Sequence, residues 1–149
     1  MNQMTTVIPN VLMRSWRPGR YPDNSKDVDV ATVDAWIREA REAGVRTILC
    51  LLDEKQLGYY RQLGEGGLLG RYRAAGFEVI HRPSEDYQPV SGKLLARIAS
   101  DFRSATLPML VHCSAGVGRT GAVVDYLTQS TRLPTSHGKD QTRRISRNV

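Results

Sequence analysis

The sequence predicts an α/β fold in which a mostly parallel central sheet is flanked by helices. Short apolar runs rich in β-branched residues, typical of buried strands, alternate along the chain with amphipathic stretches of helical period. Parallel sheets bury both of their faces, so their strands read as continuous apolar runs. A chain of 149 residues, 40% hydrophobic and 24% charged, suits one such domain, which we expect to span residues 1–149.

The first third of the chain is expected to supply two strands and one helix. Residues 10–16 predict the first strand, which ends at the turn-forming run 17–20, Arg-Pro-Gly-Arg. A helix is predicted over 31–43, with Gly44 as its stop signal. Its apolar stripe has helical spacing and consists of Val33, Trp36, Ile37 and Ala40. The apolar run 45–52 predicts a buried second strand.

The middle of the chain is less regular. Residues 53–72 are interrupted by glycines, and helix is favoured near either end of this stretch rather than throughout. Residues 77–81 alternate in polarity and predict a third strand. The segment 82–90 contains two prolines and predicts a loop. Ser91 is a candidate N-cap for an amphipathic helix that runs to about Ser104.

The last predicted strand and helix enclose a short segment of unusual composition. The strand covers 108–112 and the helix 120–129, and a further basic helix is expected over 135–147. In open parallel sheets, ligands bind beyond the carboxyl ends of the strands. The segment between this strand and this helix is therefore expected to lie where a ligand would bind.

Residues 111–121 read Val-His-Cys-Ser-Ala-Gly-Val-Gly-Arg-Thr-Gly. Five residues separate Cys113 from Arg119, which is the length needed to wrap main chain around one tetrahedral oxyanion. Gly116 and Gly118 permit backbone conformations in which successive N–H groups point inward. These groups and the positive N-terminus of the next helix favour the thiolate of Cys113. Arg119 offers a planar fork for two phosphoryl oxygens.

The candidate phosphate-binding residues surround the anion with main-chain N–H groups and one guanidinium: Ser114, Ala115, Gly116, Val117, Gly118 and Arg119. A buried cysteine in a glycine-rich turn, beside a merely solvated arginine, is the structural alternative. That alternative explains neither the His112-Cys113 pair nor the Arg-Thr-Gly ending. The segment therefore predicts attack of a thiolate on phosphorus.

The run His112-Cys113, five residues, Arg119-Thr120 resembles the signature loop of the cysteine-dependent protein tyrosine and dual-specificity phosphatases. The resemblance implies a protein-tyrosine-phosphatase-like fold of the compact dual-specificity type. It implies hydrolysis of phosphotyrosine in proteins, with phosphoserine and phosphothreonine left open, through a phosphocysteine intermediate and without cofactor or metal. It also implies that the Thr120 hydroxyl hydrogen-bonds the sulfur. His112 is expected to support the loop by hydrogen bonds.

Cleavage of a phosphomonoester requires a proton donor for the departing oxygen, and an acid on a mobile loop is the usual solution. The predicted loop 82–90 contains Glu85 and Asp86, followed by Pro89. An aspartate followed shortly by a proline resembles the general-acid loop of compact dual-specificity phosphatases. Asp86 is therefore the expected acid, and later the base that activates water, with Glu85 as the alternative.

Two features depart from the family pattern. Only 36 residues follow Cys113, where family members usually have a longer helical region with a glutamine that orients the hydrolytic water. Gln129 and Gln141 are candidates for that role, but neither lies in a recognised motif. Some members also protect the nucleophile by a disulfide to a cysteine on a neighbouring strand. Cys50 lies near that position and is expected on the same face, although an inert buried thiol is the simpler expectation.

Composition narrows the function classes and the compartment. No apolar run approaches the roughly 18 residues of a membrane span, and the first residues do not form a secretion signal. Two cysteines do not make a disulfide framework, so the cytoplasm is the expected location. The formal net charge of +6 is concentrated in a basic C-terminal segment, 132–149, with five basic groups and one acidic group. We expect this segment to be solvated.

The expected partner is a phosphorylated protein or peptide, and other functions have weaker support. An RNA 5′-phosphatase is supported by the basic segment 132–149 alone, and no aromatic-rich nucleic-acid module accompanies it. Phosphoinositide phosphatases of this superfamily usually carry lysines in the loop, where this chain has Ser114 and Val117. A phosphoresidue-binding module would not need the cysteine, arginine and aspartate together. A redox enzyme such as an arsenate reductase would need a second cysteine near Cys113.

Overall fold

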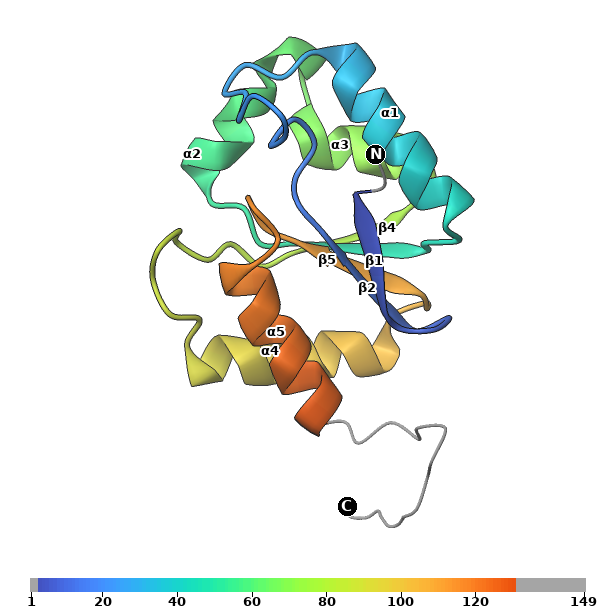
Figure 1. Ribbon diagram of the computed structural model, residues 1–149, viewed down its shortest axis with the longest axis vertical. Helices are drawn as coiled ribbons and strands as arrows, with labels where there is room; N and C mark the ends of the chain where they lie inside the picture. Colours follow the sequence, from blue (N-terminus) through green and yellow to red (C-terminus); the bar gives the residue numbers. More distant parts are fainter. Residues whose placement is uncertain (1–2, 131–149) are drawn as a thin grey trace.

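The computed structural model describes residues 3–130, which form one five-stranded sheet with helices on both faces (Figure 1). The strands are β1 (Met4–Ile8), β2 (Leu12–Ser15), β3 (Thr47–Cys50), β4 (Glu78–His81) and β5 (Met109–His112). Their order in the sheet is β1-β2-β5-β3-β4. All neighbours are parallel except the edge strand β1, which is antiparallel to β2. The predicted α/β fold with a mostly parallel sheet is therefore confirmed.

Helices cover the two faces of the sheet in separate groups, above and below it in Figure 1. The upper group is α1 (Val30–Glu42), α2 (Glu54–Leu57), the 3₁₀ helix η1 (Gly58–Leu63) and α3 (Gly67–Ala74). The lower group is α4 (Gly92–Ser104) and α5 (Gly118–Ser130). Two buried apolar clusters result, because successive strand residues point to opposite faces. Ile48 and Cys50 belong to the upper cluster, and Leu49 and Leu51 to the lower one.

The N-terminus differs from the expectation. A single strand was predicted over 10–16, but β1 precedes it and pairs with β2 in an antiparallel hairpin. Asn10 lies in the connecting turn with φ of +64°, a conformation that asparagine tolerates better than most residues. The prediction missed β1 because its five residues have a mixed exposure pattern and no clear alternation.

The other predicted elements occur close to their expected bounds. Asp29 caps α1 by accepting a hydrogen bond from the Thr32 N–H, and Ser91 caps α4 in the same way through the Leu94 N–H. The ambiguous stretch 53–72 contains the short helix α2 at its start and most of α3 at its end, as expected, but the 3₁₀ helix η1 also occupies its middle, so helical structure is more extensive than predicted. The predicted basic helix over 135–147 lies outside the described residues.

Three connections leave the carboxyl ends of neighbouring parallel strands and meet at one edge of the sheet. β3 leads into α2, β4 leads into the loop 82–91, and β5 leads through residues 113–117 into α5. The arrangement matches the general rule that open α/β sheets bind ligands beyond this edge.

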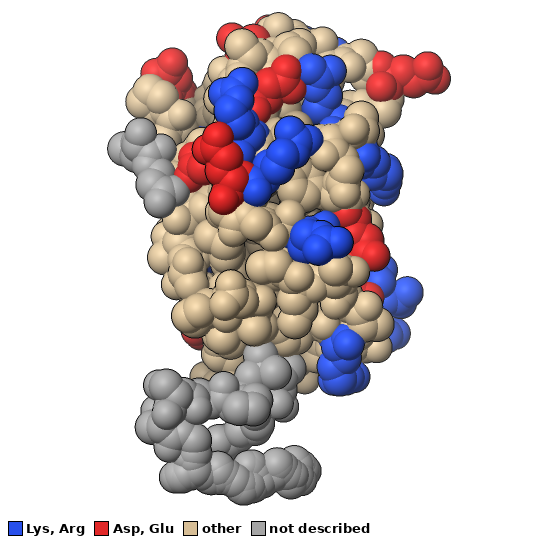
Figure 2. Space-filling model, turned by 90° about the vertical axis from the view of Figure 1, so that its right-hand side faces the viewer, with Lys and Arg blue, Asp and Glu red and all other residues tan. Residues whose placement is uncertain are grey.

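The face seen in Figure 2, which lies to the right in Figure 1, carries Lys and Arg interspersed with Asp and Glu. This face therefore presents mixed charge, and no area of one sign dominates it. Within residues 3–130, no helix has the length and apolar character needed to cross a membrane.

Candidate functional site

Residues 113–119 connect β5 to α5 and form the centre of the site. Cys113 follows the last residue of β5 and is only 2% exposed. The main-chain N–H groups of residues 114–119 make no hydrogen bond to any other residue within 3–130. Free N–H groups at a turn and a helix N-terminus attract an anion, since their partial positive charges converge there. The loop therefore has the main-chain geometry of an anion site.

Gly116 is the one position in this loop where glycine is sterically required. Its φ is +78°, and a Cβ built there would lie 2.6 Å from the Ser15 carbonyl oxygen. The Gly116 carbonyl oxygen also accepts a 2.9 Å hydrogen bond from the Arg14 Nη2. Gly118 has neither a positive φ nor a close neighbour, so the predicted need for glycine applies to Gly116 and not to Gly118.

Replacing Gly116 by alanine is expected to displace the loop from β2, because backbone atoms on both sides cannot yield. We expect a loss of on the order of 2 kcal/mol in unfolding free energy and a large loss of turnover, measured by urea unfolding and by hydrolysis of p-nitrophenyl phosphate. Gly70→Ala is the matched control, since open space surrounds that position. A Gly116→Ala protein with normal turnover would contradict this account of the loop.

The guanidinium of Arg119 is buried, with only 4% of the residue exposed, and is held from one side. Its Nη1 donates to the carbonyl oxygens of Leu51 at 3.1 Å and Ser84 at 2.6 Å and to Gln56 Oε1 at 3.0 Å. Its Nε and Nη2 have no hydrogen-bond partner within the described part of the chain. Buried donors without partners cost free energy unless a ligand satisfies them. Arg119 thus presents two free donors in the fork geometry that suits a phosphoryl group.

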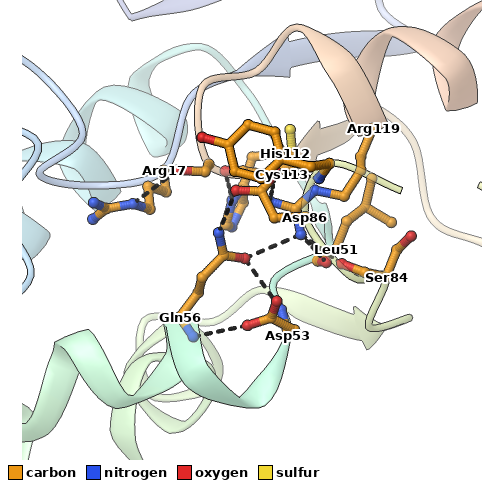
Figure 3. A network of polar contacts seen from close by, with 11 residues as sticks. Arg17, Leu51, Asp53, Gln56, Ser84, Asp86, His112, Cys113 and Arg119 are labelled. Carbon is orange, nitrogen blue, oxygen red and sulfur yellow. Dashed lines mark hydrogen bonds and ion pairs between the residues drawn. The ribbon is translucent and has the colours of Figure 1, made fainter. Parts of the chain in front are cut away.

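Asp86 lies next to this guanidinium, whereas Glu85 does not. Asp86 Oδ1 is 3.4 Å from Arg119 Nη2, and Asp86 Oδ2 accepts a 3.1 Å hydrogen bond from Gln56 Nε2 (Figure 3). Glu85 is exposed at the rim of the same cavity. Of the two predicted acids, Asp86 is the one that the fold brings to the arginine.

Gln56 was not predicted, although a local signal marks its position. Asp53 and Gln56 form a capping box at the start of α2, immediately after β3, with the Gln56 N–H donating to Asp53 Oδ1 at 2.9 Å. A capping box that directly follows a buried strand places its fourth residue near the carboxyl end of the sheet. Only the fold shows that this glutamine contacts both Asp86 and Arg119.

Arg17, which the sequence placed in a turn, is fully buried at the site. Its N–H and Nε contact the Ser114 carbonyl and hydroxyl oxygens. The remaining hydrogen-bond partners of its guanidinium are Pro18 O, Tyr60 Oη, Asn24 Oδ1 and Ser25 O. All of these acceptors are neutral, so a second buried positive charge lies beside the loop. No local pattern in the sequence separates this arginine from a solvated one.

His112 points to the sheet face opposite to Cys113. Its Nδ1 lies 3.2 Å from the Cys113 carbonyl oxygen, which only accepts, so Nδ1 carries the hydrogen and Nε2 accepts from the Tyr72 hydroxyl at 2.9 Å. Trp36 packs edge-on against the ring. Burial lowers the pKa of His112 from 6.5 to about 4, so the ring is neutral at pH 7. This geometry fits a supporting role and does not pair the imidazole with the sulfur.

Acidification is expected to destabilise the protein through His112. Between pH 6.5 and about pH 4 the unfolded histidine binds a proton and the folded one does not, so stability falls as pH falls through this window. The full loss is on the order of 3 kcal/mol, at about 1.36 kcal/mol per pKa unit. Urea unfolding from pH 7 to pH 4 measures it, and His112→Asn should flatten the curve across this window. An equally steep curve in that variant would contradict the assignment.

The remaining predicted residues lie as follows. Thr120 is buried, and its hydroxyl has no hydrogen-bond partner among the described residues, so the predicted bond to the sulfur stays a prediction. Cys50 packs in the apolar cluster above the sheet, and Cys113 packs in the cluster below it. The expectation that Cys50 lies on the same face of the sheet as Cys113 is therefore wrong. Burial raises the pKa of the Cys50 thiol to about 12, as for an inert thiol.

Gln129 is exposed and does not line the cavity, and Gln141 lies outside the described residues.

A cavity of about 800 Å³ opens over these residues. Its lining includes Arg119, Asp86, Gln56, Ser114, Ala115 and Gly118, with basic residues and tyrosines among the others. Cys113 is buried and does not belong to this lining, but it directly precedes Ser114, which does. Across residues 3–130, no three His, Cys, Asp or Glu side chains gather where they could hold a metal ion. The arrangement is an anion site lined by Arg119 and the residues that follow Cys113, whose sulfur is buried next to it.

Comparison with protein families decides the assignment. Residues 25–130 match the family described as "Polymorphic toxin system, DSP-PTPase phosphatase". The chain belongs to this family. This DSP-PTPase domain is therefore a phosphatase, and hence a hydrolase, of the protein tyrosine and dual-specificity phosphatase superfamily, as the resemblance of the loop implied. The matched range includes Glu85 and Asp86, the loop 113–119 and α5.

Solved structures support the same fold for the DSP-PTPase domain. A putative phosphatase (DUF442) from Shewanella putrefaciens CN-32 is 18% identical, with a TM-score of 0.62 over 90% of this chain and 76% of its own. Tk-PTP in its active form is 20% identical, with a TM-score of 0.58 over 88% and 76%. The core catalytic domain of the PP-IP phosphatase SIW14 from S. cerevisiae is 20% identical, with a TM-score of 0.51 over 80% and 66%. A sequence comparison with curated proteins finds no match.

Proposed function

We propose that this phosphatase hydrolyses phosphotyrosine in proteins or peptides through a phosphocysteine intermediate. The observation that carries the proposal is the state of Arg119, which is buried beside Asp86 with Nε and Nη2 unsatisfied. A dianionic phosphoryl group would satisfy both donors and the free N–H groups of 114–119 at once. No neutral ligand matches so many convergent donors.

The proposed reaction has two steps. The Cys113 thiolate attacks phosphorus, the S–P bond forms, the P–O bond to the leaving group breaks, and Asp86 gives its proton to the departing oxygen. Asp86, now a carboxylate, then takes a proton from water while that water attacks phosphorus and the S–P bond breaks. Arg119 and the loop N–H groups stabilise the charge on the equatorial oxygens in both steps.

The composition of the cavity supports an aromatic phosphoester. Tyr59, Tyr87, Pro89, Val90 and Ala122 contribute ring and aliphatic surface to its wall. Tyr87 is 95% exposed and stands directly after the acid, with φ of +63°. An exposed ring beside the proton donor suits a substrate whose leaving group is itself a ring, because aromatic pairs pack favourably. These features favour phosphotyrosine over the shorter phosphoserine.

The rim of the cavity favours a second candidate, a small polyanionic phosphoester such as an inositol phosphate. Arg20, Lys26 and Lys55 line the cavity, and none forms an ion pair within the described residues. The loop 113–119 itself contains no lysine. Here the lysines come from the segment before α1 and from α2, and they line the cavity together with the carboxylates Asp53, Glu85 and Asp86.

Substrate comparison tests the two candidates. We expect metal-free hydrolysis of a phosphotyrosyl peptide with kcat/KM at least tenfold above that for the matched phosphoseryl peptide and for inositol hexakisphosphate. Asp86→Asn should lower kcat by roughly 10²- to 10⁴-fold with little change in KM. A preference for the inositol phosphate would favour the second candidate, and strict dependence on added metal would refute both.

The proposed partner is a phosphorylated protein or peptide, and the proposed place of action is the cytoplasm. A thiolate nucleophile works only while it stays reduced, which favours a reducing compartment. Basic groups at the rim would also draw acidic sequences around the phosphotyrosine into contact with the domain.

A further inference from the structure

We infer that Gln56 is a positioning residue for Asp86, which it holds against the phosphate site from the start of α2. The inference rests on the proposed function, because it concerns the acid of that reaction. Gln56 is 4% exposed and its side chain lies between Asp53, Arg119 and Asp86 (Figure 3). Burial and three polar neighbours leave this amide little freedom.

The orientation of the Gln56 amide follows from its partners. Oε1 accepts from Arg119 Nη1 at 3.0 Å and from the Asp53 N–H at 3.4 Å, and both of these groups can only donate. A flipped amide would direct its NH₂ group at two donors. Nε2 must therefore face Asp86, where it donates to Oδ2 at 3.1 Å.

This contact sets the orientation of the Asp86 carboxyl group. Oδ2 accepts from Gln56 Nε2, whereas Oδ1 accepts a 3.0 Å hydrogen bond from the Tyr87 N–H and lies 3.4 Å from Arg119 Nη2 at the phosphate site. The Tyr87 contact lies within the loop, and Arg119 Nη2 is a donor that a phosphoryl group would engage. Among the described residues, Gln56 therefore gives the hydrogen bond that ties the acid to the start of α2 whether or not the phosphate site is occupied.

Arg119 depends on Gln56 much less than Asp86 does. Its Nη1 carries two hydrogens and has three acceptors, Leu51 O, Ser84 O and Gln56 Oε1. Loss of Gln56 Oε1 leaves one acceptor for each hydrogen. Loss of Gln56 Nε2 leaves Asp86 with one contact outside its own loop among the described residues, the 3.4 Å ion pair to Arg119 Nη2, a group that a phosphoryl ligand would engage. A substitution of Gln56 should therefore affect turnover mainly through Asp86 and much less through Arg119.

Two phosphate esters distinguish an effect of Gln56 on Asp86 from an effect on Arg119. The leaving group of phenyl phosphate needs a proton as it departs, whereas p-nitrophenolate departs readily without one. Gln56→Leu is expected to lower kcat for phenyl phosphate about tenfold or more, with KM nearly unchanged, and to lower kcat for p-nitrophenyl phosphate much less. Gln56→Glu keeps the acceptor for Arg119 but removes the donor to Asp86, and it should show the same selectivity. Gln62→Leu, at an exposed glutamine that contacts Asp27, is the control.

A double-variant cycle completes the test. In an Asp86→Asn background, Gln56→Leu should cause little further loss, because both changes remove one function. An equal loss with both esters, or losses that multiply, would overturn the role of Gln56 while leaving the acid assignment intact. If Asp86→Asn itself slows both esters equally, the acid of the proposed function is wrong instead. Thermal unfolding shows whether each variant is folded. If Gln56→Leu does not fold, Gln56→Glu takes its place in the same measurements.

Discussion

Cys113→Ser is expected to reduce turnover by roughly 10⁴- to 10⁶-fold, as the loss of other enzyme nucleophiles does. A serine hydroxyl in the same position is not ionised near neutral pH, so it neither attacks phosphorus nor leaves it as readily as a thiolate. The loop, the free N–H groups and Arg119 are untouched by the change. The variant should therefore still bind substrate while failing to hydrolyse it. Metal-free hydrolysis of p-nitrophenyl phosphate measures the first effect, and calorimetric binding of a phosphotyrosyl peptide measures the second.

Cys50→Ser is the matched control, since it makes the same substitution at the other buried cysteine. That residue packs above the sheet, so we expect a modest loss of stability and retained turnover. Rapid quenching of the unaltered protein followed by mass spectrometry should find phosphate on Cys113. Normal turnover in Cys113→Ser would refute covalent catalysis at this sulfur.

Arg119→Lys is expected to lower kcat/KM by roughly 10³-fold, or about 4 kcal/mol of transition-state stabilisation. An ammonium group cannot make the three Nη1 contacts to Leu51, Ser84 and Gln56 and also present two further donors to a phosphoryl group. The Ser84 carbonyl oxygen would lose its hydrogen bond from Arg119, whereas the Leu51 carbonyl oxygen keeps one from the Ser84 N–H, so a modest loss of stability should accompany the kinetic effect. Both are measured on one preparation, by steady-state kinetics and by urea unfolding.

Arg71→Lys is the matched control for this substitution. Arg71 also lies beside a carboxylate, that of Asp34, which it contacts through two nitrogens at 3.0 and 2.8 Å, but it lies on α3 and does not line the cavity. The pair is partly exposed, so its loss should cost little and leave turnover unchanged. An Arg119→Lys enzyme with kcat/KM within a few-fold of normal would contradict the assigned role of the fork.

Local patterns were sufficient for most of the fold because they arise from contacts within one element. The stripe of α1, the serine cap of α4 and the apolar runs of β3 and β5 each reflect burial or capping over a few residues. β1 has no such pattern, since it is a half-exposed edge strand and acquires its structure by pairing with β2. Its absence from the prediction follows from that physical difference.

The face of a side chain was less predictable than its element. Cys50 was expected to share a face with the nucleophile, but the alternation of β3 places it above the sheet while Cys113 continues the lower face of β5. A displacement of one residue in register reverses a side chain, so such an expectation cannot be drawn from approximate strand bounds.

By itself, the sequence determined the positions along the chain of β2 to β5 and of most helices, and it singled out the loop that carries Cys113 and Arg119 and the segment that carries Glu85 and Asp86, because each depends on a few adjacent residues. Only the tertiary structure decided what holds these groups. Gln56 and Arg17 reach the site across 63 and 97 positions of the chain, to Arg119 and Ser114 respectively. Contacts over such separations leave no local pattern, since they form only when the parallel strands bring their carboxyl ends together.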